Sequence, residues 1–562
     1  STLRFAEIAL TKLWTQLYDG IEVHNFDTVR ELAKDYEIVY TPCHRSHIDY
    51  LLLSYVIFNR GLMVPHIAAG INLNLPVVGQ IMRGAGAYFI RRTFSGNELY
   101  TSVFKEYLHS LLSRNTPLEY FIEGGRSRTG LLLPPKKGML SMTVQSHLRG
   151  ATKPIAFIAT YFGYEKLIEG TSYLNELNGK PKEAESIWGI LSSARKIEKI
   201  FGQVHVNFGE PIFLDQVLTA NHADQIKLNI HDELPQPVIQ TVDQVANSIL
   251  ENINKAVVVN PISLISLILL NTENHALNEN DLISQIEQYR YLLNNVKYDP
   301  RMMMTELSTV DIIQYAIKLK QVESFSQNNE NWIRVAESQR ILLSYFSNNI
   351  LHCFILPALV AMLIQSYKKV SCHYLIDTIK NMYPYFKEEF FLKWNLDELE
   401  NEIGSIINSL DNLGWIILQD NTVSMTLDEH MQSKLLSLAH LSSASLNNML
   451  IISALLQQYA PAQSLTLKEL ENMSKAVLQK LSQTQKIQSG YYFDSATLKS
   501  FISILKQNAV LSVKDDCLVI SDDFEEKISA IFSWYDSEMQ QAIITALHFT
   551  EKELKGFKQS NK

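Results

Sequence analysis

The chain has 562 residues, of which 46% are hydrophobic and 19% charged, a composition that excludes a disordered, collagen-like or solvated coiled-coil protein. Its formal net charge of −9 hides a basic stretch, because residues 51–150 hold 11 Lys and Arg against 4 Asp and Glu, whereas residues 201–562 hold 27 against 41. A local positive excess in an acidic chain predicts a small anionic ligand and no nucleic-acid partner, since nucleic acid normally requires a basic face.

The first 212 residues alternate short apolar runs with amphipathic segments, after a short helical segment expected at 1–36. Such alternation predicts an α/β domain whose mixed, largely parallel sheet is covered by helices. Strands are expected at Glu37–Thr41, Leu62–Ala68, Tyr88–Arg91, Leu118–Ile122, Pro154–Tyr161 and Val204–Phe208, and helices through Phe58, at Asn97–Arg114 and around Met139–Leu148.

The remainder of the chain is interpreted as a polar linker at 213–245 and a mainly helical C-terminal region at 246–562. Three hairpins are predicted in this region, at 322–336, 414–425 and 509–520. Helices closed by a β-hairpin resemble winged-helix units, so three such units are expected. Because the region is acidic, we expect them to make protein contacts and not to bind DNA.

One long segment, Ile341–Tyr367, contains no Asp, Glu, Lys or Arg. Polar residues and Pro357 interrupt it, which favours a buried helix over a membrane-spanning or interfacial segment. The four cysteines lie far apart without a CxxC pair, as is typical of a reducing compartment and not of a thiolate zinc site.

A histidine and an aspartate follow the first expected strand, in Thr41-Pro-Cys-His-Arg-Ser-His-Ile-Asp49. His44 could act as a general base whose tautomer Asp49 fixes, as a carboxylate does in a catalytic triad. Ser46-x-x-Asp49 also matches a helix capping box. With His47 these residues could bind a metal ion, but no further His or Cys cluster accompanies them, so no metal site is expected. The spacing alone leaves catalysis and helix capping as alternatives.

A glycine-rich basic segment, Phe121-Ile-Glu-Gly-Gly-Arg-Ser-Arg-Thr-Gly130, follows a later strand. Adjacent glycines let the backbone approach a ligand closely, and Arg126 and Arg128 can both contact phosphate oxygens. The GxxxxGK[ST] spacing of a P-loop is absent. The alternative is a solvated basic turn that continues into Lys136 and Lys137.

A third motif, Gly86–Arg92, is a strand that ends in two arginines. All three motifs follow the carboxyl end of an expected strand, and in α/β sheets ligands bind at that edge. A base, a carboxylate that orients it and several arginines at one edge predict transfer to a hydroxyl group of a phosphorylated substrate.

Four segments of the chain, taken in order, resemble the four sequence blocks of the HxxxxD glycerolipid acyltransferase family. They are His44-x4-Asp49 with its apolar helix, Gly86–Arg92, Phe121–Arg128 and Ile158–Tyr161. Within this family, the wording of four segments is similar to that of the bacterial membrane-associated glycerol-3-phosphate acyltransferases. These segments are CHRSHIDYLLLSY, HIAAGINLN, FIRRTF and EGGRSRTG. VNFGEP at 206–211 extends the resemblance toward the C-terminal half. One HxxxxD motif is weak evidence, whereas four blocks in order are strong evidence.

This resemblance implies a reaction and a set of site residues. A fatty acyl group passes from acyl-CoA or acyl carrier protein to the sn-1 hydroxyl of sn-glycerol 3-phosphate, which gives 1-acyl-glycerol 3-phosphate (lysophosphatidate) in the first step of phospholipid synthesis. His44 is implied to be the general base and Asp49 its partner, without a cofactor, a metal or an acyl-enzyme. The residues implied to bind the acceptor are Arg92, Glu123, Gly124, Arg126 and Arg128.

The resemblance also implies a location, the cytoplasmic face of the bacterial inner membrane, where the protein is peripheral or monotopic and contacts the lipid surface. Two departures from the family pattern stand out. Ala159 occupies a position that is usually proline, and 36 residues precede Glu37 where relatives have a sizeable region, so we expect a fragment of a longer protein. The alternatives are an acyltransferase for dihydroxyacetone phosphate or lysophosphatidate, and a non-catalytic scaffold that binds phospholipid.

Overall fold

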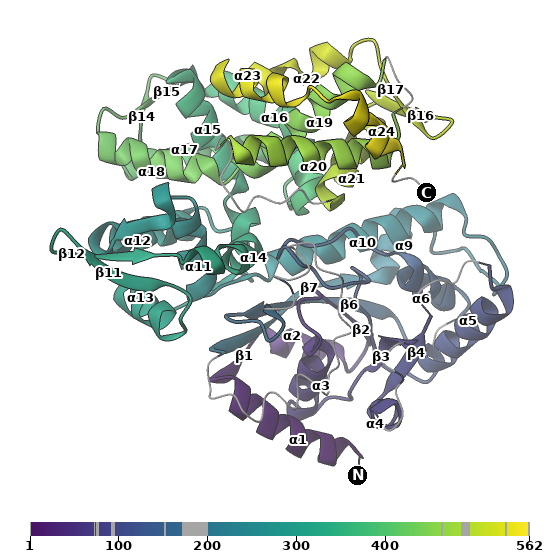
Figure 1. Cartoon of the computed structure of the whole chain (residues 1–562). Helices are drawn as coiled ribbons and strands as arrows, with labels where there is room; N and C mark the ends of the chain where they lie inside the picture. The colour runs from purple at the N-terminus through teal and green to yellow at the C-terminus, as the bar shows by residue number, and fades with distance from the viewer. Residues whose placement is uncertain are drawn as a thin grey trace. The chain divides into compact units, whose positions relative to one another are not determined.

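The computed structural model divides into two compact units (Figure 1). The first unit comprises residues 1–267, 298–325 and 334–350, and the second comprises 268–297, 326–333 and 351–562. The structure describes residues 2–71, 74, 78–91, 96–150, 153–170, 173, 201–461, 465–484, 495–533 and 537–559.

The first unit is an α/β structure in which strands and helices alternate. Its elements are α1 (Thr2–Leu17), β1 (Gly20–His24), α2 (Phe26–Leu32), β2 (Glu37–Pro42), α3 (Asp49–Asn59), β3 (His66–Gly70), α4 (Val78–Gly84), β4 (Ala87–Ile90), α5 (Glu98–Ser113), β5 (Leu118–Glu119), α6 (Gly138–Leu148), β6 (Ile155–Tyr164), β7 (Gln203–Phe213), α9 (Leu214–Ala220), α10 (Gln236–Lys255), β8 (Val258–Val259), α11 (Pro261–Leu270), β10 (Met303–Met304), α13 (Thr309–Lys318) and α14 (Arg340–Ile350).

Seven of these strands form one sheet in the order β1-β7-β6-β2-β5-β3-β4. Every neighbouring pair is parallel except β6 and β7, which are antiparallel, so the predicted mixed and largely parallel sheet is confirmed. The register of β6 and β7 shifts between Ile158 and Thr160. Ala159 therefore lies at a bulge, a position in a sheet where proline is also tolerated.

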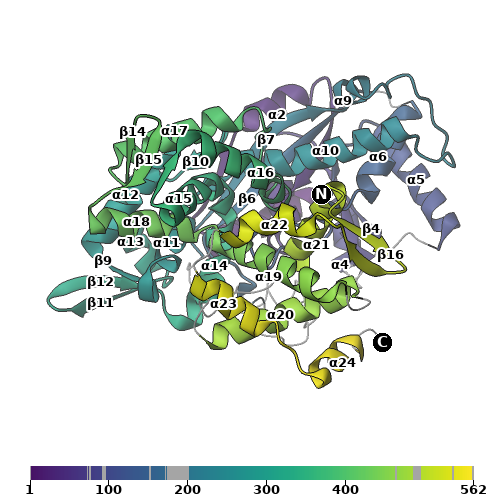
Figure 2. The same ribbon diagram turned by 90° about the horizontal axis from the view of Figure 1, so that it is seen from above.

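Helices cover both faces of this sheet. Figures 1 and 2 show α10 lying along β6 and β7 on one face, whereas α1 and α3 lie on the other. All residues of β2 and β6 are buried, as expected for strands covered on both sides, and their sequences accordingly read as continuous apolar runs. Because β2, β5 and β6 run parallel, their carboxyl ends lie at the same edge of the sheet.

Two expectations about the first unit were wrong in detail. The segment 1–36 contains strand β1 besides helices, and β1 pairs with β7, a strand distant in sequence that local periodicity does not reveal. The expected linker at 213–245 contains α9 and the first half of α10. These helices form because their apolar side chains recur at helical spacing and are buried, namely Leu214, Leu218, Val238, Val242 and Val245.

The second unit is mainly helical, as predicted. Its elements are β9 (Ala276–Asn278), α12 (Glu279–Asn295), β11 (Glu323–Gln327), β12 (Glu330–Arg334), α15 (Ile355–Tyr367), β13 (Lys369–Ser371), α16 (Cys372–Phe390), α17 (Leu399–Asn412), β14 (Ile416–Gln419), β15 (Thr422–Met425), α18 (Glu429–His440), α19 (Ser443–Tyr459), α20 (Leu467–Gln483), α21 (Ser495–Gln507), β16 (Leu511–Lys514), β17 (Cys517–Ile520), α22 (Phe524–Ser533), α23 (Ser537–Ala546) and α24 (Glu551–Gln559); the short 3₁₀ turns of the chain are Glu273–His275, Glu337–Gln339 and Leu351–Cys353.

All three predicted hairpins are present, as β11/β12, β14/β15 and β16/β17. In the last two, Gln419 pairs with Thr422 and Lys514 with Cys517, which leaves two-residue loops. The central residues of all three turns have positive φ, as the type I′ turn requires, and all are Asn or Asp, the side chains that best tolerate it after glycine: Asn328, Asn329, Asp420, Asn421, Asp515 and Asp516. Whether these units are winged helices stays a prediction.

The segment Ile341–Tyr367 is not one helix. It is divided between α14 and α15 by the 3₁₀ turn Leu351–Cys353, and most of α15 is buried, as expected for a core helix. Among the described residues, no single helix is long and apolar enough to cross a membrane, although two bent helix pairs, Glu337–Cys353 with Ile355–Tyr367 and Glu429–His440 with Ser443–Tyr459, have sufficient length and apolar composition.

Candidate active site

The His44–Asp49 pair lies where β2 ends and α3 begins. The Nδ1 atom of His44 is 3.0 Å from Oδ2 of Asp49, and Asp49 has no solvent exposure. With Nδ1 directed to the carboxylate, Nε2 is the ring nitrogen that remains to accept a proton from a substrate. The predicted pair of a histidine and an orienting carboxylate is thus present as a contact.

Backbone and side-chain donors hold the Asp49 carboxylate in place. Its Oδ2 accepts hydrogen bonds from the backbone N–H groups of Arg45 (2.6 Å) and Ser46 (2.8 Å), and its Oδ1 accepts one from the hydroxyl of Tyr164 (2.6 Å). The bond from the Ser46 backbone is one half of a capping box. The other half would be a bond from the backbone N–H of Asp49 to the Ser46 hydroxyl, but this N–H donates to the carbonyl of Ser46 (3.3 Å), and the hydroxyl donates to Glu169. Asp49 therefore starts the helix and orients His44 at the same time.

Glu123, in the glycine-rich segment, contacts the backbone of the loop that holds His44. Its Oε1 accepts a hydrogen bond from the N–H of His44, and its Oε2 accepts one from Leu133, both at 2.8 Å. Burial raises the pKa of Glu123 to about 7, although Arg45 and the two N–H groups oppose that rise. Since backbone donors occupy both oxygens, the geometry favours a positioning role for Glu123 over direct contact with an acceptor.

The arginines of the glycine-rich segment gather around Tyr173. The guanidinium of Arg126 lies 3.2 Å from the Tyr173 hydroxyl and 3.7 Å from the Glu169 carboxylate, and that of Arg128 lies 4.4 Å from the centre of the Tyr173 ring. The Tyr173 hydroxyl donates to the carbonyl of Arg45 at 2.7 Å. Two cationic side chains are therefore held next to the loop that carries His44 and Asp49.

Glycine is required at two positions of this segment. Gly124 has a φ of +62°, and a Cβ there would lie 2.6 Å from the side chain of Lys136. Gly130 has a φ of +89°, and a Cβ there would lie 2.1 Å from the carbonyl oxygen of Tyr345. The segment can follow its path only with glycine at both positions. For Gly124 the structure thus gives a conformational role.

The surroundings of His44 keep its imidazole neutral. Burial lowers the pKa of His44, Asp49 raises it, and the positive charge of Arg126 lowers it further. The ring stacks on Phe121 with a centroid distance of 3.9 Å and an interplanar angle of 19°. A neutral imidazole oriented by a carboxylate is the state that a general base needs near neutral pH.

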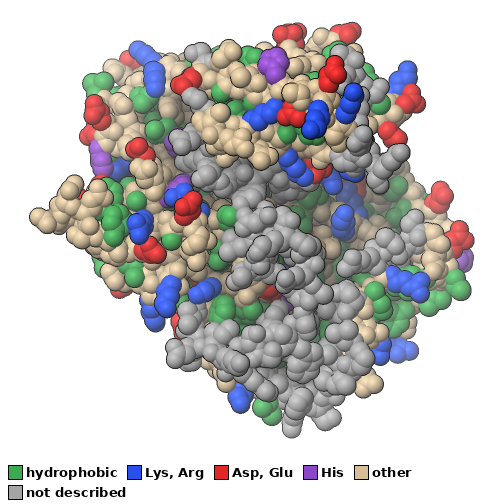
Figure 3. Space-filling view, viewed as in Figure 1, with side chains coloured by type: hydrophobic (Ala, Val, Ile, Leu, Met, Phe, Trp, Pro, Cys, Tyr) green, Lys and Arg blue, Asp and Glu red, His purple; other side chains and the backbone are tan. Residues whose placement is uncertain are grey.

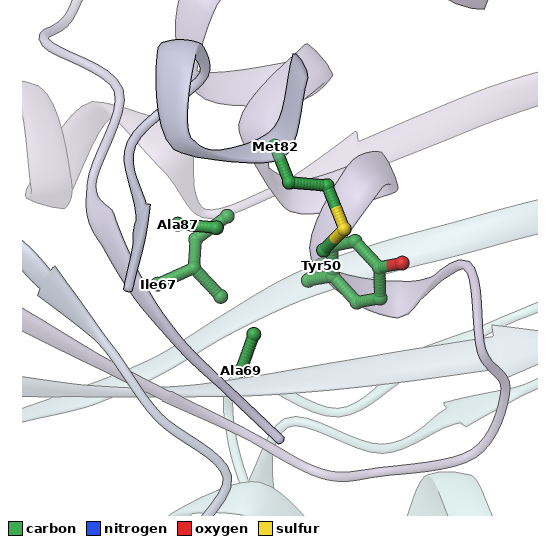
Figure 4. Close-up of a cluster of buried hydrophobic side chains, with 5 residues drawn as sticks. All are labelled: Tyr50, Ile67, Ala69, Met82 and Ala87. Atoms are coloured by element: carbon green, nitrogen blue, oxygen red, sulfur yellow. The ribbon is translucent and has the colours of Figure 1, made fainter. Parts of the chain in front are cut away.

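An apolar pocket lies along α3, the helix that begins at Asp49. Its lining includes Tyr50, Leu51, Tyr55, Ile67 and Met82, from α3, β3 and α4. Figure 4 shows the buried cluster that forms one wall of this pocket, with Tyr50 and Met82 facing Ile67, Ala69 and Ala87. Phe121, which stacks on His44, packs against the same cluster.

The structure places most of the predicted site residues at one edge. His44, Asp49, Glu123, Gly124, Arg126 and Arg128 lie together in the first unit, whereas Arg92 lies outside the described residues. The preceding arginine, Arg91, is positioned over the ring of Tyr100 on α5, with 4.7 Å between the guanidinium carbon and the ring centre.

Sequence reasoning missed three residues that contact the predicted site residues and their loops, namely Tyr164, Glu169 and Tyr173. Glu169 is buried and accepts hydrogen bonds from the Ser46 hydroxyl and from the backbone N–H of His47. Tyr164 and Glu169 follow the fourth block within nine residues. Their proximity to the end of an expected strand is the feature of the sequence that could have identified them. No local pattern marks Tyr173, because its contacts are made with residues far away in the sequence.

Comparison with known proteins places this architecture in a family. Residues 173–514 match the family described as "Glycerol-3-phosphate acyltransferase C-terminal region", and residues 20–158 match the family described as "Acyltransferase". A curated relative from Pseudomonas paraeruginosa (strain DSM 24068 / PA7), named glycerol-3-phosphate acyltransferase, is 39% identical over 510 residues, which are 91% of this chain and 61% of the relative. A relative of the same name from Haemophilus influenzae (strain PittEE) is 39% identical over 542 residues, 96% of this chain and 66% of the relative.

The chain thus spans about three fifths of the length of the Pseudomonas relatives that it matches. Among solved structures, the 1-acyl-sn-glycerophosphate (LPA) acyltransferase PlsC from Thermotoga maritima matches 44% of this chain and 77% of its own, at 17% identity and a TM-score of 0.24, a likeness that carries no argument. The family match over residues 173–514 covers more than half of the chain. On that basis the chain belongs to the glycerol-3-phosphate acyltransferase family.

Proposed function

We propose that this protein transfers a fatty acyl group from acyl-CoA or acyl carrier protein to the sn-1 hydroxyl of sn-glycerol 3-phosphate, which gives 1-acyl-glycerol 3-phosphate. The observation that carries the proposal is the 3.0 Å contact between His44 and a fully buried Asp49, with two arginines held beside it. The names of the relatives support the acceptor, and the family resemblance supports the donor and the position of transfer.

In the proposed reaction His44 acts first as a base and then as an acid. Its Nε2 takes the proton from the acceptor hydroxyl while the hydroxyl oxygen attacks the thioester carbonyl carbon. The tetrahedral intermediate then expels the thiolate as the carbon–sulfur bond breaks, and the imidazolium returns its proton to the sulfur. Asp49 stabilises the imidazolium formed between these two steps through the bond to Nδ1. The chemistry of this route requires no acyl-enzyme.

The acceptor phosphate is assigned to the arginines. A phosphate monoester carries between one and two negative charges near pH 7, and guanidinium groups bind its oxygens through charge-assisted hydrogen bonds. Arg126 and Arg128 flank Ser127, whose backbone N–H bonds the carbonyl of His44 at 3.0 Å. This bond fixes the arginines relative to the base, so a phosphate bound by them keeps the acceptor hydroxyl near His44.

The acyl chain is assigned to the apolar pocket beside α3. Tyr50, the residue after Asp49, is part of its lining, and the lining is almost entirely apolar. A chain that enters this pocket removes apolar surface from water at about 25 cal/mol per Å², so the pocket provides binding energy that grows with chain length. We therefore expect Leu51→Phe, which narrows the pocket, to shift the preference toward shorter acyl chains.

Attachment to the cytoplasmic face of a bacterial inner membrane is also proposed. Leu99, Val103 and Tyr107 are 78%, 60% and 42% exposed and recur every four residues, so they form one apolar stripe on α5. Hydrophobic side chains are visible over α5 at the right-hand edge of the face in Figure 3. Such a stripe suits a helix that lies in a lipid surface.

The membrane proposal is tested by sedimentation with phosphatidylglycerol and phosphatidylethanolamine vesicles. We expect Leu99→Ser with Val103→Ser to weaken binding strongly, whereas Leu427→Ser, at a 90% exposed leucine elsewhere, has little effect. Complete release of the unmodified protein by high salt alone would contradict an apolar anchor.

The reaction is tested by measuring thiol release from palmitoyl-CoA with and without glycerol 3-phosphate. The proposal predicts release that depends on the acceptor and yields the 1-acyl product. Dihydroxyacetone phosphate and lysophosphatidate, offered in the same assay, distinguish the related acyltransferase activities. Binding of phospholipid without thiol release would instead indicate a scaffold.

A further inference from the structure

Two histidines and a glutamate come together on the outermost pair of strands in the sheet. Glu22 and His24 are two residues apart on β1 and therefore project from the same face of the sheet. His205 lies on β7 directly opposite Glu22 in the parallel register. The cluster thus joins a terminal strand of the sheet to its neighbour, and it has no part in the site described above.

The ligating atoms of this cluster have the spacing of a metal site. Oε2 of Glu22 is 3.2 Å from Nδ1 of His205 and 3.7 Å from Nε2 of His24, and one ligating atom from each residue lies within 4.8 Å of the others. Ligand atoms of a tetrahedral zinc ion, each about 2.0–2.1 Å from the metal, are roughly 3.3 Å apart. Small side-chain rotations are sufficient to reach that arrangement.

The imidazoles of the cluster lack well-formed hydrogen bonds. His205 is 4% exposed, and neither its ring nitrogens nor Nε2 of His24 have a hydrogen-bond partner of good geometry. Buried polar atoms are rarely left in this state, and an ion is one of the explanations for it. Glu22 is half exposed, which gives an ion access from solvent.

A second carboxylate is placed behind His205. Oε1 of Glu165 is 3.8 Å from Nε2 of His205, and its Oε2 is fixed by the backbone N–H of Gln203 and the hydroxyl of Tyr315, both at 2.5 Å. Histidines that bind metals commonly direct their second ring nitrogen to such a carboxylate. Glu22 and Glu165 thus place two carboxylates around His205, with Glu22 beside Nδ1 and Glu165 on the side of Nε2.

We propose that Glu22, His24 and His205 bind a divalent transition-metal ion of the zinc type, with Glu165 orienting His205 as an outer carboxylate. Two imidazoles and a carboxylate form a donor set that suits Zn²⁺ and Co²⁺. The two carboxylates balance the charge of the ion. When the ion binds, two ligands from β1 and one from β7 tie the two strands together.

Titration of the purified chain with CoCl₂ tests the proposal, because tetrahedral Co²⁺ absorbs visible light. We expect a band that saturates at one equivalent and disappears when ZnCl₂ is added. His24→Ala and Glu22→Gln, both at partly exposed positions and so compatible with folding, should each weaken Co²⁺ binding by at least about 10-fold.

His373→Ala is the matched control, since His373 lies 3.2 Å from Asp377 in an exposed pair to which the described part of the chain adds no third ligand. It should leave the Co²⁺ titration unchanged. Absence of a saturable band, or a band that survives His24→Ala, would overturn the proposal. Because the readout is metal binding and not acyl transfer, its outcome is independent of the proposed function.

Discussion

Two histidine–carboxylate clusters in the same sheet differ in the charge of their imidazole. At the end of β2, Asp49 contacts His44, and burial lowers the pKa of His44. At β1 and β7, Glu22 and Glu165 flank His205, and its pKa is raised to about 9 despite burial. Both rings are largely shielded from water, so burial alone does not account for the difference.

The difference comes from the charged groups that surround each ring. The Asp49 carboxylate accepts three further hydrogen bonds, and a cation, Arg126, lies close enough to His44 to oppose its protonation. His205 instead faces two carboxylates. A histidine next to one carboxylate and one cation keeps a lowered pKa and suits proton transfer, whereas two carboxylates raise the pKa of a histidine and favour its protonated form.

The largest effect is expected from breaking the first cluster. Asp49→Asn keeps the size of the side chain but removes the charge that stabilises the imidazolium, so kcat should fall by about 10²–10⁴, equivalent to roughly 3–5 kcal/mol. His44→Ala should be similarly inactive, and the double variant scarcely worse, because the two residues act as one unit. The measurement is thiol release normalised to folded protein.

A helix-capping aspartate elsewhere provides the control for that variant. Asp428 caps α18 and accepts hydrogen bonds from the backbone of His430 and Met431. Asp428→Asn should cost about 1 kcal/mol or less and leave kcat unchanged. If folded Asp49→Asn protein retained more than about half of the wild-type kcat, Asp49 would be a capping residue and not the partner of the base.

The next effect concerns the arginines that distinguish the first cluster from the second. Arg126→Ala or Arg128→Ala should raise the KM for glycerol 3-phosphate by about 10- to 100-fold, because a lost charge-assisted contact costs about 1.5–3 kcal/mol. The KM for the acyl donor should change little. Arg30→Ala, which removes an exposed arginine paired with Asp27 at 2.7 Å, is the control and should alter neither value. Equal losses for both substrates would argue against a phosphate contact.

A matched pair of tyrosines allows the two clusters to be compared directly. Tyr164 donates a hydrogen bond to Asp49 at 2.6 Å, and Tyr315 donates one to Glu165 at 2.5 Å. Tyr164→Phe should lower kcat by about 10-fold, since the carboxylate that orients His44 loses one of its donors. Tyr315→Phe makes the same chemical change in the other cluster and should leave kcat unaltered. Similar losses in both variants would indicate a general effect on the sheet.

The sequence was more informative about the first cluster than about the second. His44 and Asp49 lie within six residues between a strand and a helix, so a motif reveals them, and parallel strand order brings Glu123 and Arg126 to the same edge. Glu22 and His205 meet only because β1 pairs with β7, and nothing local in either segment predicts that pairing. The hairpins of the second unit were predictable because their pairing is local. A two-residue turn joins two strands that follow each other in the sequence and pair with each other.

The smallest effect is a shift in the pH dependence of the first cluster. A general base must be unprotonated, and burial lowers the pKa of His44 from its usual value of 6.5, so kcat/KM should rise with pH and the midpoint of this rise should lie below pH 6.5. Arg126 opposes protonation of His44, so Arg126→Ala should move this acidic limb to higher pH, whereas Asp49→Asn should move it to lower pH because Asp49 favours the protonated ring. An NMR titration of the His44 imidazole measures the same shifts without relying on turnover. If both substitutions moved the limb in the same direction, the charges of Arg126 and Asp49 would not be what sets the protonation of His44.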